Sequence, residues 1–162
     1  MSQQPVISFD PAQIDFSHLR SRRRIAIDGD PGSGKTTLAK KLESGLGAKA
    51  FSLDDYLYED GRPYLAQIKY EGLARDIAVS GEAPVVVEGV CLLKALAKIC
   101  FHYDYLIFAM FFIHGRREFD DYSDPRIRLP KSSLQREIVE YYRECRPEKV
   151  CDLARCLSVG FE

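Results

Sequence analysis

The feature that most constrains the fold is a glycine-rich stretch, GDPGSGKT, at residues 29–36. It matches the pattern G-x-x-x-x-G-K-[ST] at every fixed position. Such glycines let the backbone curl so that several N–H groups point at one phosphate, and the following helix presents its positive end to the same anion. Lys35 is placed to reach the β- and γ-phosphates of a nucleotide, and the Thr36 hydroxyl to bind Mg²⁺. The nucleotide-binding residues predicted from this stretch are Gly29, Asp30, Pro31, Gly32, Ser33, Gly34, Lys35, Thr36 and Thr37.

Strand-like and helix-like patterns alternate along the rest of the chain. Apolar runs predict strands at 24–28, 48–53, 84–90 and 103–113, with a last short strand within 153–161. Helical spacing of apolar residues predicts helices at 35–44, 65–79, 91–100 and 131–146. This alternation predicts one three-layer α/β domain over residues 1–162, with a mainly parallel sheet of about five strands. Residues 1–20, which include Pro5 and Pro11, are expected to form an irregular lead-in.

Composition excludes several classes of function. The formal net charge of −1 lacks the basic excess of a protein that grips nucleic acid through many phosphates. No apolar run reaches the roughly 18 residues that a membrane-spanning helix needs. The five cysteines are odd in number and lack paired C-x-x-C spacing, so we expect reduced thiols in a cytoplasmic protein without a zinc site.

Three carboxylates are expected at the carboxyl ends of the strands, where ligands bind in open α/β sheets. Asp54 and Asp55 follow the second predicted strand, and either could align an acceptor hydroxyl or serve Mg²⁺; helix capping or a solvated turn is the alternative. Glu88 interrupts the apolar segment VVVEGV, and a buried carboxylate needs a partner. That partner is either a Mg²⁺ ion with its waters or a neighbouring arginine.

Three segments together resemble the uridine kinase and phosphoribulokinase group of P-loop kinases. They are IDGDPGSGKTTLAKKL at 27–42, FSLDDYLY at 51–58 and VVVEGVCLL at 85–93. The resemblance implies a P-loop NTPase fold with a short lid. It also implies that Asp54 is the catalytic base, and that Glu88 is associated with metal and substrate, so that Thr36, Glu88 and Asp54 are the expected metal residues.

The same group carries arginines in a lid that closes over the phosphates after the fourth strand. Residues 114–130 fall at this place, and Arg116 and Arg117 are the matching candidates for catalytic arginines, with Arg126 and Arg128 as further ones. Planar guanidinium groups suit the charge that develops on a transferring phosphoryl group. The stretch 55–84 is shorter than in most uridine kinases, so the reaction carries over to this chain and the acceptor does not.

Taken together, the sequence predicts an enzyme that uses ATP and Mg²⁺ to phosphorylate a hydroxyl of a small molecule. Lys35, Asp54, Arg116 and Arg117 are its expected catalytic residues, and a homodimer is compatible with such an enzyme. The main alternative is a nucleotide-dependent switch or regulatory protein with no small-molecule acceptor. A degenerate nucleotide-binding fold without chemistry is disfavoured because Lys35, Thr36, Asp54 and Glu88 are all present.

Overall fold

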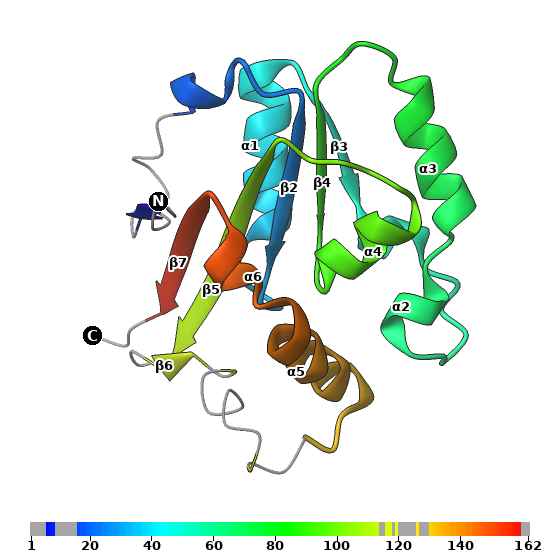
Figure 1. Cartoon of the computed structure of the whole chain (residues 1–162), viewed down its shortest axis with the longest axis vertical. Helices are drawn as coiled ribbons and strands as arrows, with labels where there is room; N and C mark the ends of the chain where they lie inside the picture. Colours follow the sequence, from blue (N-terminus) through cyan, green and yellow to red (C-terminus); the bar gives the residue numbers. More distant parts are fainter. Residues whose placement is uncertain are drawn as a thin grey trace.

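A computed structural model of the chain describes residues 6–8, 16–113, 116–117, 119, 126 and 130–159. Its centre is a sheet in the order β1-β7-β5-β2-β4-β3, with β6 added to β5 (Figure 1). The strands are β1 Val6–Ser8, β2 Arg24–Gly29, β3 Lys49–Ser52, β4 Val85–Gly89, β5 Tyr105–Ile113, β6 Arg116–Arg117 and β7 Leu153–Val159. Neighbouring strands pair parallel, apart from β6, which runs antiparallel to β5. The predicted α/β fold with a mainly parallel sheet is confirmed.

The helices lie on both faces of this sheet (Figure 1). They are α1 Lys35–Leu46, α2 Tyr64–Gln67, α3 Tyr70–Val79, α4 Leu92–Lys98, α5 Ser133–Cys145 and α6 Pro147–Val150, with short 3-10 turns at η1 Ser17–Leu19 and η2 Leu53–Tyr56. Successive side chains of a strand point to opposite faces. In β2, Ile25 and Ile27 accordingly pack in the cluster that contains the apolar side of α1, whereas Ala26 packs in the cluster beneath α3 and α4. Three layers result, as the alternating pattern predicts.

One predicted helix proves to be two. The segment 65–79 forms α2 and α3, separated at Ile68, whose backbone is extended (φ −71°, ψ 128°). Ile68 is buried and forms an isolated bridge with Leu57, while the N–H of Lys69 donates to the carbonyl of Tyr56 at 2.7 Å. Backbone pairing with a distant segment therefore replaces helical hydrogen bonds here, and local periodicity gives no sign of it.

The irregular lead-in predicted for residues 1–20 is wrong in two places. Val6–Ser8 form a strand because the outer edge of β7 offers free backbone groups for parallel pairing. Ser17–Leu19 form a 3-10 turn, and the Leu19 side chain is fully buried against the α1 face of the sheet. Both features depend on residues far away in sequence.

Most of the predicted lid, residues 114–130, lies outside the described residues. The part of it that the structure describes first is β6, which pairs antiparallel with β5 so that Arg117 lies opposite Phe112. In the part of the chain that the structure covers, no helix is long and apolar enough to cross a membrane. The four cysteines whose side chains are described, Cys91, Cys100, Cys145 and Cys151, are free thiols.

Candidate nucleotide and acceptor site

The candidate site lies where the connections leave the sheet in opposite directions. β2 occupies the middle of the sheet between β4 and β5, and the chain leaves its carboxyl end through the glycine-rich stretch into α1. In open α/β sheets this reversal of strand order creates a crevice for ligands. The predicted loop thus occupies the position at which such a fold binds them.

Glycine is required at the first loop position by close packing of two strands. Gly29 has φ +148°, and an added Cβ would lie only 1.9 Å from the carbonyl oxygen of Ala109 on β5. The N–H of Asp30 donates to that same oxygen at 2.9 Å. The loop therefore starts from a corner fixed on β5. At its other end Gly34, with φ +80°, leads into the first turn of α1, whose N–H groups have no partner within the helix and whose residues Lys35 and Thr36 line the pocket.

The side chain of Lys35, the first residue of α1, folds back into the preceding loop. Its ammonium donates to the carbonyl oxygen of Asp30 at 2.6 Å and to the Ser33 hydroxyl at 3.5 Å. Burial lowers the pKa of Lys35, and the charges of surrounding carboxylates, Glu88 foremost, oppose that shift. A fixed, largely dehydrated cation next to a curled backbone is suited to hold a phosphate.

Glu88 meets the first turn of α1. It is the penultimate residue of β4, is 3% exposed, and accepts a hydrogen bond from the Thr36 hydroxyl at 2.9 Å. The alternative partner, an arginine, is not found: within the described residues Glu88 forms no ion pair. The adjacent Gly89 permits this arrangement, since a Cβ there would lie 2.6 Å from the Leu53 side chain. Thr36 and Glu88 thus offer two adjacent oxygen ligands.

Asp54 lines the same pocket as the loop. It lies in η2, is exposed, and its Oδ1 accepts a hydrogen bond from the Tyr64 hydroxyl at 2.8 Å. Burial and the Asp54 charge raise the pKa of Tyr64 well above its usual range, so this hydroxyl stays protonated and donates. Asp55 does not line the pocket. The spacing of Tyr64 and Asp54 along the sequence gives no indication of this contact.

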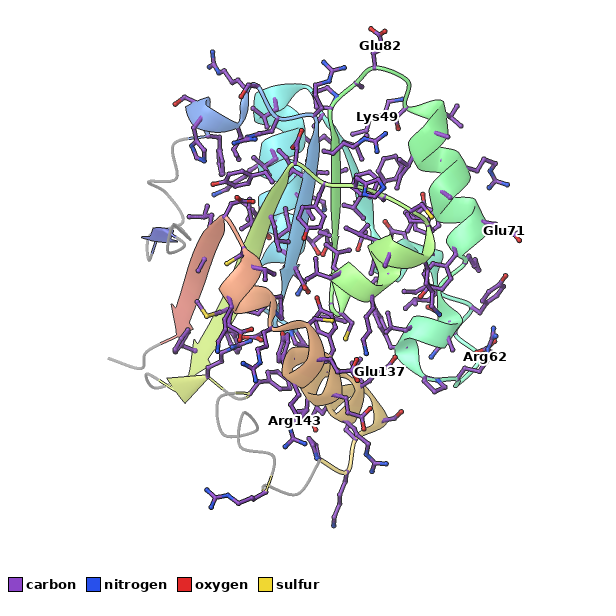
Figure 2. All side chains as sticks on the ribbon, viewed as in Figure 1. Lys49, Arg62, Glu71, Glu82, Glu137 and Arg143 are labelled. Carbon is purple, nitrogen blue, oxygen red and sulfur yellow. The ribbon has the colours of Figure 1, made fainter. Side chains whose placement is uncertain are left out.

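Helix α5 holds Tyr64 in place. Glu137, labelled in Figure 2, accepts hydrogen bonds from the N–H groups of Tyr64 at 2.8 Å and Leu65 at 2.9 Å. These N–H groups open α2 and have no partner within that helix, so a carboxylate from another element caps it. The pocket measures about 390 Å³. Its lining residues are Pro31, Gly32, Gly34, Lys35, Thr36, Thr37, Asp54, Tyr64, Glu88, Gly89, Val90 and Leu134.

The two arginines expected in the lid belong to β6. The Arg117 side chain is buried and forms an ion pair with Asp30, its Nε lying 2.7 Å from Oδ2. It does not line the pocket. The backbone of Arg116 pairs with Ile113, and its side chain lies outside what the structure describes. Only Arg117 can therefore be placed, and its partner is the loop itself.

A carboxyl group that the sequence analysis did not single out lies directly beneath the loop. Asp28 is fully buried, and its Oδ1 accepts from the N–H of Gly29 at 2.8 Å and from that of Leu92 at 3.4 Å. The Tyr141 hydroxyl of α5 donates to its Oδ2. Burial raises the pKa of Asp28 to about 6, although these donors oppose the shift. A polar residue at the end of an otherwise apolar strand was the available signal.

Comparisons with known proteins identify similar folds. No protein-family model matches the chain, and no curated protein matches it. Among solved structures, a protein described as a possible uridine kinase from Bacillus stearothermophilus aligns at TM-score 0.49 and 16% identity, over 96% of this chain and 90% of its own. Shikimate kinase from Acinetobacter baumannii aligns at 0.47 and 10%, over 91% and 89%. A gluconokinase from Sinorhizobium meliloti aligns at 0.45 and 20%, over 86% and 83%. At these values the function has to come from the chain's own residues.

Proposed function

We propose that this protein transfers the terminal phosphate of ATP to a hydroxyl group of a small molecule. The observation that supports it is that the glycine-rich loop and Asp54 line the same pocket. A loop alone binds a nucleotide, whereas a carboxylate across the pocket gives an acceptor hydroxyl a group to donate its proton to. The acceptor would lie between Asp54 and the loop, beside Val90 and Leu134.

The donor set fits a nucleotide with Mg²⁺. Lys35 and the N–H groups of the loop would hold the phosphates, and Thr36 and Glu88 supply the hard oxygen atoms that Mg²⁺ prefers. The described residues contain no cluster of three or more metal-ligating side chains. That is compatible with a kinase, because Mg²⁺ in such sites uses one or two carboxylates together with substrate phosphates and water. When bound, the ion neutralises phosphate charge.

Asp54 is proposed as the catalytic base. Tyr64 occupies its Oδ1 with a hydrogen bond, which fixes the carboxylate and leaves the other oxygen available for the acceptor. Asp55, the next residue, does not line the pocket. Arg116, the first residue of β6, is proposed to help cover the phosphates, as the family resemblance implies.

The experiment measures ADP formation from Mg-ATP across a panel of nucleosides, vitamins and sugar alcohols. We expect one acceptor class to stimulate turnover. Asp54→Asn should reduce transfer by about 10² or more while leaving ATP affinity near normal, and Lys35→Ala should abolish productive ATP binding. Asp55→Asn is the matched control and should retain transfer. Slow turnover that no acceptor stimulates would instead identify a nucleotide-dependent switch, and a larger loss in Asp55→Asn would move the base to that residue.

A further inference from the structure

An acidic side chain in a phosphate-binding loop poses an electrostatic problem. Asp30 is the second residue of the loop, yet like charges repel and a nucleotide brings several negative charges to this place. The structure turns the Asp30 side chain away from the pocket: the residue is 1% exposed and is not part of the lining. Its buried carboxylate must be compensated from behind the loop.

Four hydrogen bonds provide this compensation. Arg117 donates from Nε to Oδ2 at 2.7 Å and from Nη2 to Oδ1 at 2.8 Å, a two-pronged pairing of guanidinium and carboxylate. The N–H of Phe111 donates to Oδ2 at 2.9 Å, and the Tyr142 hydroxyl to Oδ1 at 2.7 Å. The donors come from β5, β6 and α5, so three elements meet at one loop residue.

The guanidinium of Arg117 itself packs against two aromatic rings. Its Cζ lies 5.0 Å from the Phe108 ring centre and 4.8 Å from that of Tyr142. Tyr142 in turn packs edge-on against Phe108 and Phe119, with ring centres 5.7 Å and 5.5 Å apart. Stacked, buried and doubly hydrogen-bonded, Arg117 has little freedom to leave Asp30.

The backbone of Asp30 links this pair to the phosphate-binding groups. Its carbonyl oxygen accepts from the Lys35 ammonium at 2.6 Å and from the N–H of Ser33 at 3.2 Å. A displacement of Asp30 would therefore move the carbonyl oxygen that orients Lys35 and would change the hydrogen bond to Ser33 that shapes the loop. The pair thus fixes the loop as well as neutralising its charge.

From this geometry we propose that Arg117 is a positioning residue that neutralises Asp30 and sets the shape of the phosphate-binding loop. This differs from the sequence expectation, in which Arg117 contacts the transferring phosphoryl group. The inference rests on the proposed function to the extent that the loop must bind a nucleotide. Removing Arg117 leaves a buried, unpaired carboxylate behind the phosphates, whereas removing both charges together leaves none.

The experiment is a double-mutant cycle on the affinity for Mg-ADP, measured by titration calorimetry. Arg117→Met should weaken binding about tenfold or more, and the double variant Asp30→Asn/Arg117→Met should recover to within about threefold of wild type. Urea denaturation checks that each variant is folded. Should Arg117→Met alone fail to fold, wild type is compared with the double variant, in which no buried charge is left unpaired, and a double variant that binds Mg-ADP more than about threefold more weakly than wild type counts against the inference. Arg62→Met is the matched control, because Arg62 pairs with Asp60 at the surface. The affinity of this variant for Mg-ADP should equal that of wild type.

Three results would overturn the inference. The first is a folded Arg117→Met that binds Mg-ADP as tightly as wild type. The second is a double variant as weak as the single one, since the loss would then not come from the unpaired Asp30 charge. The third is a double variant that binds Mg-ADP normally but loses acceptor-dependent turnover, because Arg117 would then act on the reacting phosphate. A wild-type protein that binds no Mg-ADP would instead refute the proposed function.

Discussion

Replacing Asp28 by asparagine should remove a specific pH dependence of stability. Asp28 is fully buried, and burial raises its pKa from 3.8 to about 6. The folded protein therefore binds this proton more tightly than the unfolded chain does between about pH 4 and pH 6. Stability from this group is fully present below the unfolded pKa and is lost as the pH rises through the folded pKa. Asparagine keeps the size and an acceptor oxygen but carries no titrating proton.

The magnitude follows from the size of the shift. A change from 3.8 to about 6 spans about two pKa units, which corresponds to roughly 3 kcal/mol of unfolding free energy. The stability of wild type relative to Asp28→Asn should fall by that amount between about pH 4 and pH 6, and stay constant above pH 7. Comparing the two proteins cancels the contributions of the other carboxylates.

Urea denaturation at a series of pH values measures this difference. Asp55→Asn is the control, because Asp55 is exposed and should change the slope little. Parallel pH profiles for wild type and Asp28→Asn would refute the reasoning. If the variant does not fold, the titration of the Asp28 carboxyl carbon in wild type, followed by NMR, decides the same question: a midpoint near pH 4 would show that burial does not hold the proton.

Two further changes test the loop and the base. Gly29→Ala should cost at least about 3 kcal/mol of stability in thermal or urea unfolding, because its Cβ would collide with the Ala109 carbonyl. Gly45→Ala in α1 is the control: nothing lies within 4 Å of the added Cβ, so this change should stabilise the protein by up to about 1 kcal/mol. Tyr64→Phe removes the donor to Asp54 and should lower kcat about tenfold with Mg-ATP affinity unchanged; a loss of nucleotide affinity of equal size would show that Tyr64 supports the loop instead.

The conformation of the glycine-rich loop could be predicted from sequence because its requirements are local. Gly29 and Gly34 adopt backbone conformations that other residues disfavour, and Lys35 follows at a fixed distance along the chain. The strands β2, β4 and β5 were equally accessible, since continuous apolar runs are typical of strands buried on both faces. These features depend on residues that are adjacent in the sequence.

What the sequence did not predict depends on distant contacts. The break at Ile68 comes from pairing with Leu57, and the strand at Val6–Ser8 exists only beside β7. Arg117 appeared as a lid residue because its charge and position fit that role, whereas the fold brings it to Asp30, 87 residues away. Partner choice for a charged side chain is a property of the folded chain, and no periodicity encodes it.

Helix α5 contacts both the glycine-rich loop and the segment that carries Tyr64. Its consecutive tyrosines, Tyr141 and Tyr142, donate to Asp28 and Asp30 on either side of Gly29. Glu137, four residues before Tyr141, accepts a hydrogen bond from the N–H of Tyr64 at the start of α2, and the Tyr64 hydroxyl in turn donates to Asp54. Helix α5 thus connects the glycine-rich loop, proposed to bind the nucleotide, to Tyr64, which lines the proposed acceptor pocket. Free-energy coupling between two ligands is reciprocal, so we expect each substrate to tighten the binding of the other by the same factor.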